Sequence, residues 1–291
     1  MYYVLAIITA ILSGFTPVLK KNYVTNTRSV KNSGDIYLLV NIVAATIYFY
    51  ILAGGNVPLN LITLIFSVIF ALIGILSVLF GLVAYNYAAV VYMTVITGAL
   101  GTILPFLYEL IFTDVVFTTN KIISVFMRVL AISIMLFFNK GERVSKKGIL
   151  ICILCGIISG ASGITTRMYA NFPGVESDGS FFFWTNVFTL PMVFINTFRK
   201  SDFQTVKNAF KSIKPYNYFY ALGSMLINNA ITFISIEIIR HISGTAYSVI
   251  AGSVNILTAA FISAVIYKES ITLQTLLSVL LSIVAVVLSL L

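Results

Sequence analysis

The chain alternates between long apolar runs and short polar connections along its whole length. Ten runs approach the roughly 20 residues that a helix needs to cross the hydrocarbon core of a bilayer, and each run holds at most one charged residue. The strands of a membrane barrel are about 10 residues long and alternate in polarity, so they do not fit these runs. The pattern predicts an all-α polytopic membrane protein with ten transmembrane helices, over 2–19, 35–53, 61–82, 89–112, 122–138, 148–169, 180–198, 217–239, 244–267 and 271–290.

Hydropathy alone does not define the structure of two segments. The run 61–112 is too long for one helix, and the polar group Ala84-Tyr85-Asn86-Tyr87 is its best turn. The connection 199–216 places apolar residues at helical spacing between lysines, which fits either an amphipathic helix on the membrane surface or a solvated loop. These apolar residues are Phe203, Val206, Phe210 and Ile213.

The two halves of the chain repeat one another. Ile11-Leu12-Ser13-Gly14 matches Ile157-Ile158-Ser159-Gly160, and Tyr23 matches Tyr169. Each half, 1–139 and 148–291, contains five predicted spans, so the second copy enters the bilayer from the opposite side. Inverted repeats of this kind are typical of secondary transporters. Further matched positions are Gly34 and Asn41 with Gly179 and Asn186, and Tyr92, Phe106 and Asp114 with Tyr247, Phe261 and Glu269.

Composition and charge agree with a membrane protein. Only 9 % of the residues are charged and the mean hydropathy is +1.03, whereas soluble domains carry about 25 % charged residues. The net charge of +9 lies mainly in the connections after the odd-numbered spans, so it sets orientation and does not indicate nucleic-acid binding. Basic loops face the cytoplasm, which predicts both termini outside. The many Ile, Asn and Lys residues suggest a bacterial cytoplasmic (inner) membrane. The N-terminal run lacks a basic region and a cleavage site, so we expect a first transmembrane helix and no cleaved signal.

The end of each half resembles a known family. Ser243-Gly-Thr-Ala-Tyr-Ser-Val, followed by Tyr267-Lys-Glu-Ser-Ile-Thr and a last apolar span, resembles the EamA-type domain of the drug/metabolite transporter superfamily. The first half repeats this pattern more loosely, with Pro105 and Asp114. The resemblance implies two inverted five-helix repeats, a central cavity walled by helices 1–4 and 6–9, and peripheral helices 5 and 10. Small four-helix members carry a glutamate in their first helix, whereas spans 1 and 6 hold no carboxylate here.

Polar residues inside the spans are the candidate substrate ligands, because polar groups in hydrocarbon need partners or water. Asn41 and Asn186 are paired by the repeat, and the alternative for each is a hydrogen bond between helices. Asn228 and Asn229 lie mid-membrane about 100° apart on their helix, and Asn255 is central in the ninth span.

Aromatic and charged residues give further candidates. Trp184 opens the seventh span, either as an interfacial anchor or as an aromatic wall for a flat or cationic ligand. Tyr92 and Tyr247 are expected to face each other across the site. Glu237 is either paired locally with Arg240 and His241 or is a cation-binding or proton-coupling carboxylate. Arg128 is expected to be packed against a partner or to snorkel.

The sequence lacks the features of an enzyme. It contains no P-loop for nucleotide hydrolysis, no metal-ligand cluster and no nucleophile–base pair. Cys152 and Cys155 lie inside a span, where packing is the expected role. We therefore predict a secondary transporter that needs no cofactor and moves a small polar metabolite by alternating access. Export of an amino acid or a related compound, driven by a solute, H⁺ or Na⁺ gradient, is the first hypothesis. Uptake of a cationic metabolite such as choline, a channel, and a non-transporting scaffold are the alternatives. Monomer and homodimer both remain open.

Overall fold

The computed structural model describes residues 1–88, 90–112, 118–138, 146–242, 244–267 and 273–290. Within these ranges the regular structure is helical, and six helices (α1, α2, α3, α6, α7 and α9) are long and apolar enough to cross a membrane. The all-α architecture with several membrane-length helices is therefore confirmed. The helices are α1 (Tyr2–Asn26), α2 (Ser33–Leu52), α3 (Leu61–Ala84), α4 (Val90–Phe112), α5 (Thr119–Phe138), α6 (Lys146–Asn171), α7 (Asp178–Lys200), α8 (Phe203–Ser212), α9 (Pro215–His241), α10 (Gly244–Tyr267) and α11 (Leu273–Leu290).

Local sequence explains several of the helix boundaries. The Asn60 side chain accepts a hydrogen bond from the Thr63 backbone N–H (2.8 Å) and caps α3, as expected for an N-cap asparagine. The predicted turn after Ala84 is confirmed, since α3 ends there. The connection 199–216 contains α8, so of the two alternatives the structure has a helix there.

The first helix is longer than hydropathy predicts. The predicted span ends at residue 19, before two lysines, but α1 continues to Asn26. A hydropathy window ends a span at the first charges, whereas a helix ends only where its backbone hydrogen bonding stops. Lys20 and Lys21 are therefore helical residues of α1 and not part of the connection after the first predicted span.

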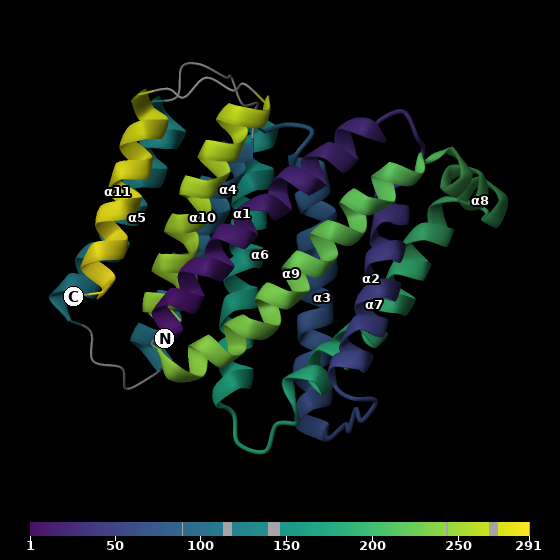
Figure 1. The fold of residues 1–291 in the computed structure, drawn as a ribbon, viewed down its shortest axis with the longest axis horizontal. Helices are drawn as coiled ribbons and strands as arrows, with labels where there is room; N and C mark the ends of the chain where they lie inside the picture. Colours follow the sequence, from purple (N-terminus) through teal and green to yellow (C-terminus); the bar gives the residue numbers. More distant parts are fainter. Residues whose placement is uncertain (89, 113–117, 139–145, 243, 268–272, 291) are drawn as a thin grey trace.

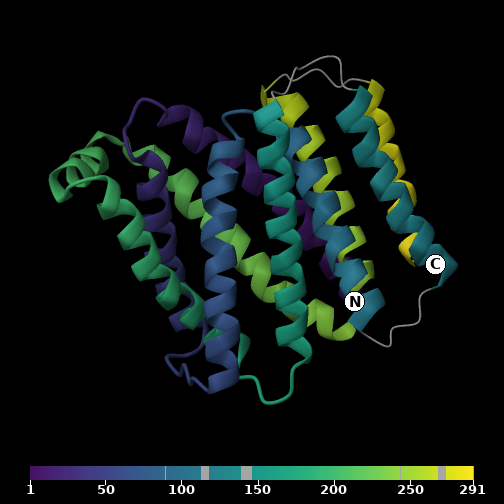
Figure 2. The same cartoon turned by 180° about the vertical axis from the view of Figure 1, so that it is seen from behind.

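The packing of the helices follows the same scheme in both halves. α1 packs against α9 and α10, while α6 packs against α3 and α4. α2 lies against α7, and α4 lies against α10. Figure 1 shows α5 and α11 side by side at one edge of the molecule and α8 at the opposite edge. From behind, α3 and α6 run next to each other through the middle of the bundle (Figure 2).

A buried arginine joins three helices away from the centre. Arg128 of α5 is 1 % exposed and donates hydrogen bonds to Val249 O (2.9 Å), Ser253 Oγ (2.6 Å) and Gly98 O (3.2 Å). A side chain at Gly252 would collide with its guanidinium. Arg128 is thus packed between α4, α5 and α10 and does not snorkel.

A second buried arginine forms an ion pair. Arg167 of α6 contacts Glu109 Oε1 of α4 at 2.9 Å and Ser248 Oγ of α10 at 2.6 Å. The Arg167 and Glu109 side chains are 4 % and 8 % exposed. These contacts tie α4, α6 and α10 together.

Candidate functional site

A cavity of about 310 Å³ lies among six helices: α1, α2, α3, α6, α7 and α9. Ligand pockets commonly begin at roughly this volume. Four of the predicted ligands line it, namely Asn41, Asn186, Asn228 and Asn229. The fourth and ninth predicted spans, which correspond to α4 and α10, contribute no described residue to this lining. α5 and α11 are also absent from the described lining, in keeping with a peripheral place.

On α2, α7 and α9 one helix face points at the cavity. Ser224, Asn228 and Thr232 follow one another at intervals of four residues on α9, and α7 shows Phe182, Asn186 and Thr189. This spacing keeps side chains on one helix face. On α2 the series is Tyr37, Asn41, Ala45 and Phe49.

Contacts between these faces give the cavity two different ends. At one end the Tyr37 hydroxyl shares a hydrogen bond with Ser224 Oγ (2.5 Å). At the other end the Phe49 ring stacks on Phe182 with centroids 5.0 Å apart, and Phe70 lies 5.9 Å from Phe182. One end is therefore polar and the other aromatic, with the asparagines between them.

The repeat-paired asparagines make the same hydrogen bond. Asn41 Nδ2 donates to Tyr37 O, and Asn186 Nδ2 donates to Phe182 O, both at 2.7 Å. Each amide group is thereby fixed by its own helix, which leaves its oxygen as the acceptor available to a solute.

Two further polar groups in the lining lack a partner among the described residues. Asn229 Nδ2 and Thr185 Oγ1 are buried atoms without a hydrogen bond to any described group. A buried polar atom without a partner costs about 1–3 kcal/mol. A polar solute, or water, in the cavity would satisfy both.

The remaining predicted ligands lie elsewhere. Tyr247 packs with Ala6 and Ile250, and Asn255 of the same helix is also outside the cavity lining. Trp184 Nε1 donates to Val57 O (3.0 Å) in the connection between α2 and α3. The side chain of Tyr92 lies outside the described residues. The aromatic-wall hypothesis for Trp184 and the facing tyrosines thus receives no support from the described contacts.

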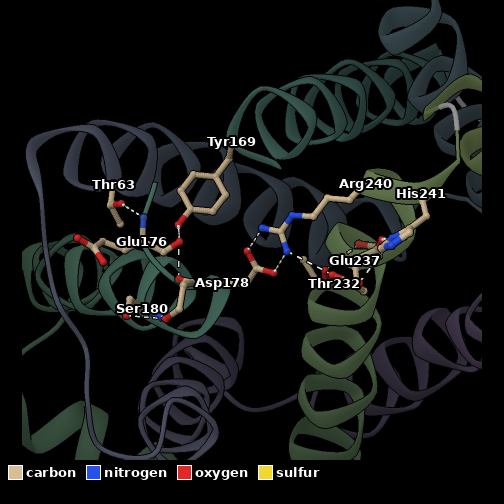
Figure 3. A network of polar contacts seen from close by, with 11 residues as sticks. Thr63, Tyr169, Glu176, Asp178, Ser180, Thr232, Glu237, Arg240 and His241 are labelled. Atoms are coloured by element: carbon tan, nitrogen blue, oxygen red, sulfur yellow. Dashed lines mark hydrogen bonds and ion pairs between the residues drawn. The ribbon is translucent and has the colours of Figure 1, made fainter. Parts of the chain in front are cut away.

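Glu237 also lies outside the cavity lining, at the end of α9. Its side chain is 49 % exposed and contacts Arg240 (3.3 Å) and His241 (3.5 Å). Arg240 in turn binds both oxygens of Asp178 on α7, at 2.6 and 2.8 Å. Figure 3 shows this ionic cluster beside the Tyr169 hydroxyl, which donates to Glu176 O (2.7 Å). The local ion pair, one of the two interpretations from the sequence, is the arrangement that the structure contains.

The sequence prediction omitted one charged lining residue, Lys20. The signal was present in the sequence, since Lys20 directly follows the apolar run of the first span, but the positive-inside rule assigned it to orientation. Hydroxyl residues of the lining were also missed, because serine and threonine are common in apolar helices and carry little signal. These are Ser77, Ser159, Ser162, Thr185, Thr189, Ser224 and Thr232.

Comparisons with known proteins establish the fold alone. No family model and no curated protein matches the chain. A solved structure described only as "Crystal structure of protein" superimposes with a TM-score of 0.66 at 14 % identity, covering 99 % of this chain and 96 % of the other. The chain therefore shares its whole-length helical architecture with a solved structure, whose description names no activity.

Proposed function

We propose that this protein is a secondary transporter that moves a small polar metabolite across a membrane by alternating access. The observation that carries the proposal is the cavity of about 310 Å³ lined by four asparagines within a bundle of apolar helices. Unpartnered polar atoms at membrane depth are expensive, so they commonly mark a solute pathway. Export of an amino acid or a related compound across a bacterial cytoplasmic membrane remains the first hypothesis.

The proposed mechanism uses ten membrane crossings in two inverted repeats of the drug/metabolite transporter type. The packing of α1 on α9 and α10, and of α6 on α3 and α4, supports it, since exchanging the halves exchanges these contacts. Matched residues add support: Tyr23 donates to Ser33 O (2.7 Å) at the start of α2, as Tyr169 does to Glu176 O (2.7 Å) just before α7. In transporters of this type one repeat rocks against the other around a central site.

The cavity favours metabolite transport over the cation alternative. Among the described residues no carboxylate lines it, and the described lining residue that can carry a charge is the basic Lys20, so these residues offer a choline-like ligand no counter-ion. Trp184, which motivated that alternative, lies outside the lining. A coupling ion, H⁺ or Na⁺, would need a site other than Glu237.

Counterflow in proteoliposomes tests the proposal. Vesicles loaded with unlabelled amino acids, organic acids, amines or nucleosides are diluted into trace labelled solute, and a transporter produces transient, saturable accumulation. Empty vesicles and vesicles containing heat-unfolded protein are the controls. Uptake that never saturates and shows no counterflow indicates a channel. Absence of flux with every class would contradict the proposal and favour a scaffold.

A further inference from the structure

Among the described residues that line the cavity, Lys20 is the only charged one. It lies one helical turn before Tyr23, whose ring centroid is 4.9 Å from that of Tyr37. Residues three apart share a helix face, so Lys20 lies on the side of α1 that carries Tyr23, and it lines the same cavity as Tyr37 and Ser224.

No described carboxylate pairs with this lysine. The ion pairs found between described residues involve Arg167, Arg240 and His241. Asp35, in the first turn of the neighbouring α2, accepts a hydrogen bond from Asn196 of α7 (2.8 Å). The lysine therefore faces the cavity without a counter-ion from the described protein.

The buried arginines of the bundle differ from Lys20. Arg128 is bound by two carbonyl oxygens and a hydroxyl, and Arg167 by a carboxylate and a hydroxyl. A cation at membrane depth is costly unless it is paired or hydrated. An anion that enters the cavity would give Lys20 the partner that the arginines already have.

The rest of the lining is suited to the remainder of such a solute. Asn229 Nδ2 is a buried donor without a described partner and adds to the attraction for negative charge, as does the hydroxyl of Thr185. The amide oxygens of Asn41 and Asn186 can accept from N–H or O–H groups. The aromatic end, with Phe49, Phe70 and Phe182, can hold an apolar body.

We propose that the transported solute is a small organic anion whose carboxylate or phosphate group binds the Lys20 ammonium, while its apolar part lies against the phenylalanine end. This inference rests on the transport function proposed above and names its substrate class. The lysine acts as the anion anchor of the cavity.

Two charge series, each on a constant carbon skeleton, test the anchor, and phenyl phosphate is added as a phosphate probe. Purified protein in detergent is melted with phenylacetate, phenylacetamide, phenethylamine and phenyl phosphate, and with butanoate, butanamide and butylamine. A ligand that binds only the folded state raises the melting temperature in proportion to its saturation. We expect the anions to raise it, and the amides and amines to have little effect at equal concentration. Comparison of phenylacetate with phenyl phosphate tells a carboxylate site from a phosphate site.

Substitutions test whether Lys20 is the residue through which anions raise the melting temperature. We expect Lys20→Gln to weaken binding of the effective anion by about tenfold or more, since removing one member of a desolvated charge pair has a large effect. Lys20→Arg keeps the charge and should retain binding within a few fold. Lys21→Gln is the matched control, because it removes the same charge one residue away and Lys21 does not line the cavity. Should Lys20→Gln fail to fold, Lys20→Arg together with the wild-type charge series still decides the question.

The outcomes separate this inference from the proposed function. If amides or amines stabilise the protein as well as anions, or if Lys20→Gln binds anions as tightly as Lys21→Gln does, the anion anchor is wrong. Counterflow of a neutral or cationic solute would then leave the transport function intact. If no compound binds and no solute class shows counterflow, both proposals fail.

Discussion

Two groups of charged and polar side chains lie inside this bundle, and they differ in how completely they are partnered. Arg167 with Glu109, and Arg128 with the backbone of α4 and α10, have oxygen partners within 3.2 Å. The cavity instead holds Lys20 without a described counter-ion and two buried polar atoms without a described hydrogen bond.

The difference indicates that one group of residues stabilises the bundle and the other binds the solute. The hydrogen bonds and ion pair of Arg128, Arg167 and Glu109 fasten α4, α5, α6 and α10 to one another, so their loss should act on stability. Groups open to the cavity contribute little to holding the helices together, so their loss should act on solute binding. Each of the following substitutions tests one side of this division.

The largest expected effect is on the buried ion pair. Glu109→Gln leaves Arg167 buried, with only part of its partners, and should lower the free energy of unfolding by about 3 kcal/mol, as removal of one member of a buried pair typically does. The measurement is the unfolding midpoint in detergent. The double variant Glu109→Gln with Arg167→Gln should recover part of the loss, because no unpaired charge remains. A loss below about 1 kcal/mol would show that the pair does not fasten the helices.

The second-largest expected effect on stability comes from substituting Gly252, one of two glycines that lie against Arg128. An Ala side chain at Gly252 would collide with the guanidinium, whereas one at Gly98 would lie 3.5 Å from Arg128 Nη2. Gly252→Ala should cost about 2 kcal/mol of unfolding free energy, since overpacking displaces the arginine from its acceptors.

Gly98→Ala is the matched control and should be nearly neutral, because the better helix propensity of alanine offsets a modest contact. Equal melting temperatures for the two glycine variants would contradict this account of the α4–α10 contact.

The helices were the more predictable part of this molecule. Apolar runs and their polar interruptions located the turn after Ala84, and the helical spacing in 199–216 gave α8 as one of two alternatives, because both features depend on local sequence. The end of α1 was placed too early, since hydropathy registers Lys20 but not the continuing backbone hydrogen bonds to Asn26.

The sequence identifies residues of the candidate site only where a polar residue is unusual inside an apolar span. Asn41, Asn186, Asn228 and Asn229 were identified in this way and line one cavity. Asn255 is as polar and as central, yet it lies outside that lining, because the rotation of α10 in the bundle is set by packing between distant segments. The exclusion of Glu237 from the lining depends on the same tertiary information.

A smaller effect, on transport and not on stability, is expected at the repeat-paired asparagines. Asn41→Ala removes an acceptor from the cavity and should raise the KM for the transported solute about tenfold, equivalent to one hydrogen bond of about 1.4 kcal/mol. The melting temperature should change little, because the amide bonds only to its own helix.

Asn255→Ala is the control from another helix and should leave KM unchanged. If both variants raise KM equally, the described cavity is not the solute site.

The smallest effect is expected at Glu237, the carboxylate that sequence alone offered as a coupling group. Its side chain is half exposed, and Arg240 keeps its bidentate partner Asp178 when Glu237 is lost. Glu237→Gln should therefore change unfolding free energy by less than about 0.5 kcal/mol and leave both the transport rate and its pH profile as in the wild type. The measurement is counterflow between pH 5 and pH 9 in wild-type and variant proteoliposomes, with Asp178→Asn as the companion variant that removes the stronger partner of Arg240. A flattened pH profile in Glu237→Gln alone would assign the coupling role to this glutamate. The cluster of Asp178, Glu237 and Arg240 would then act on transport, as the cavity residues do, and not only on stability.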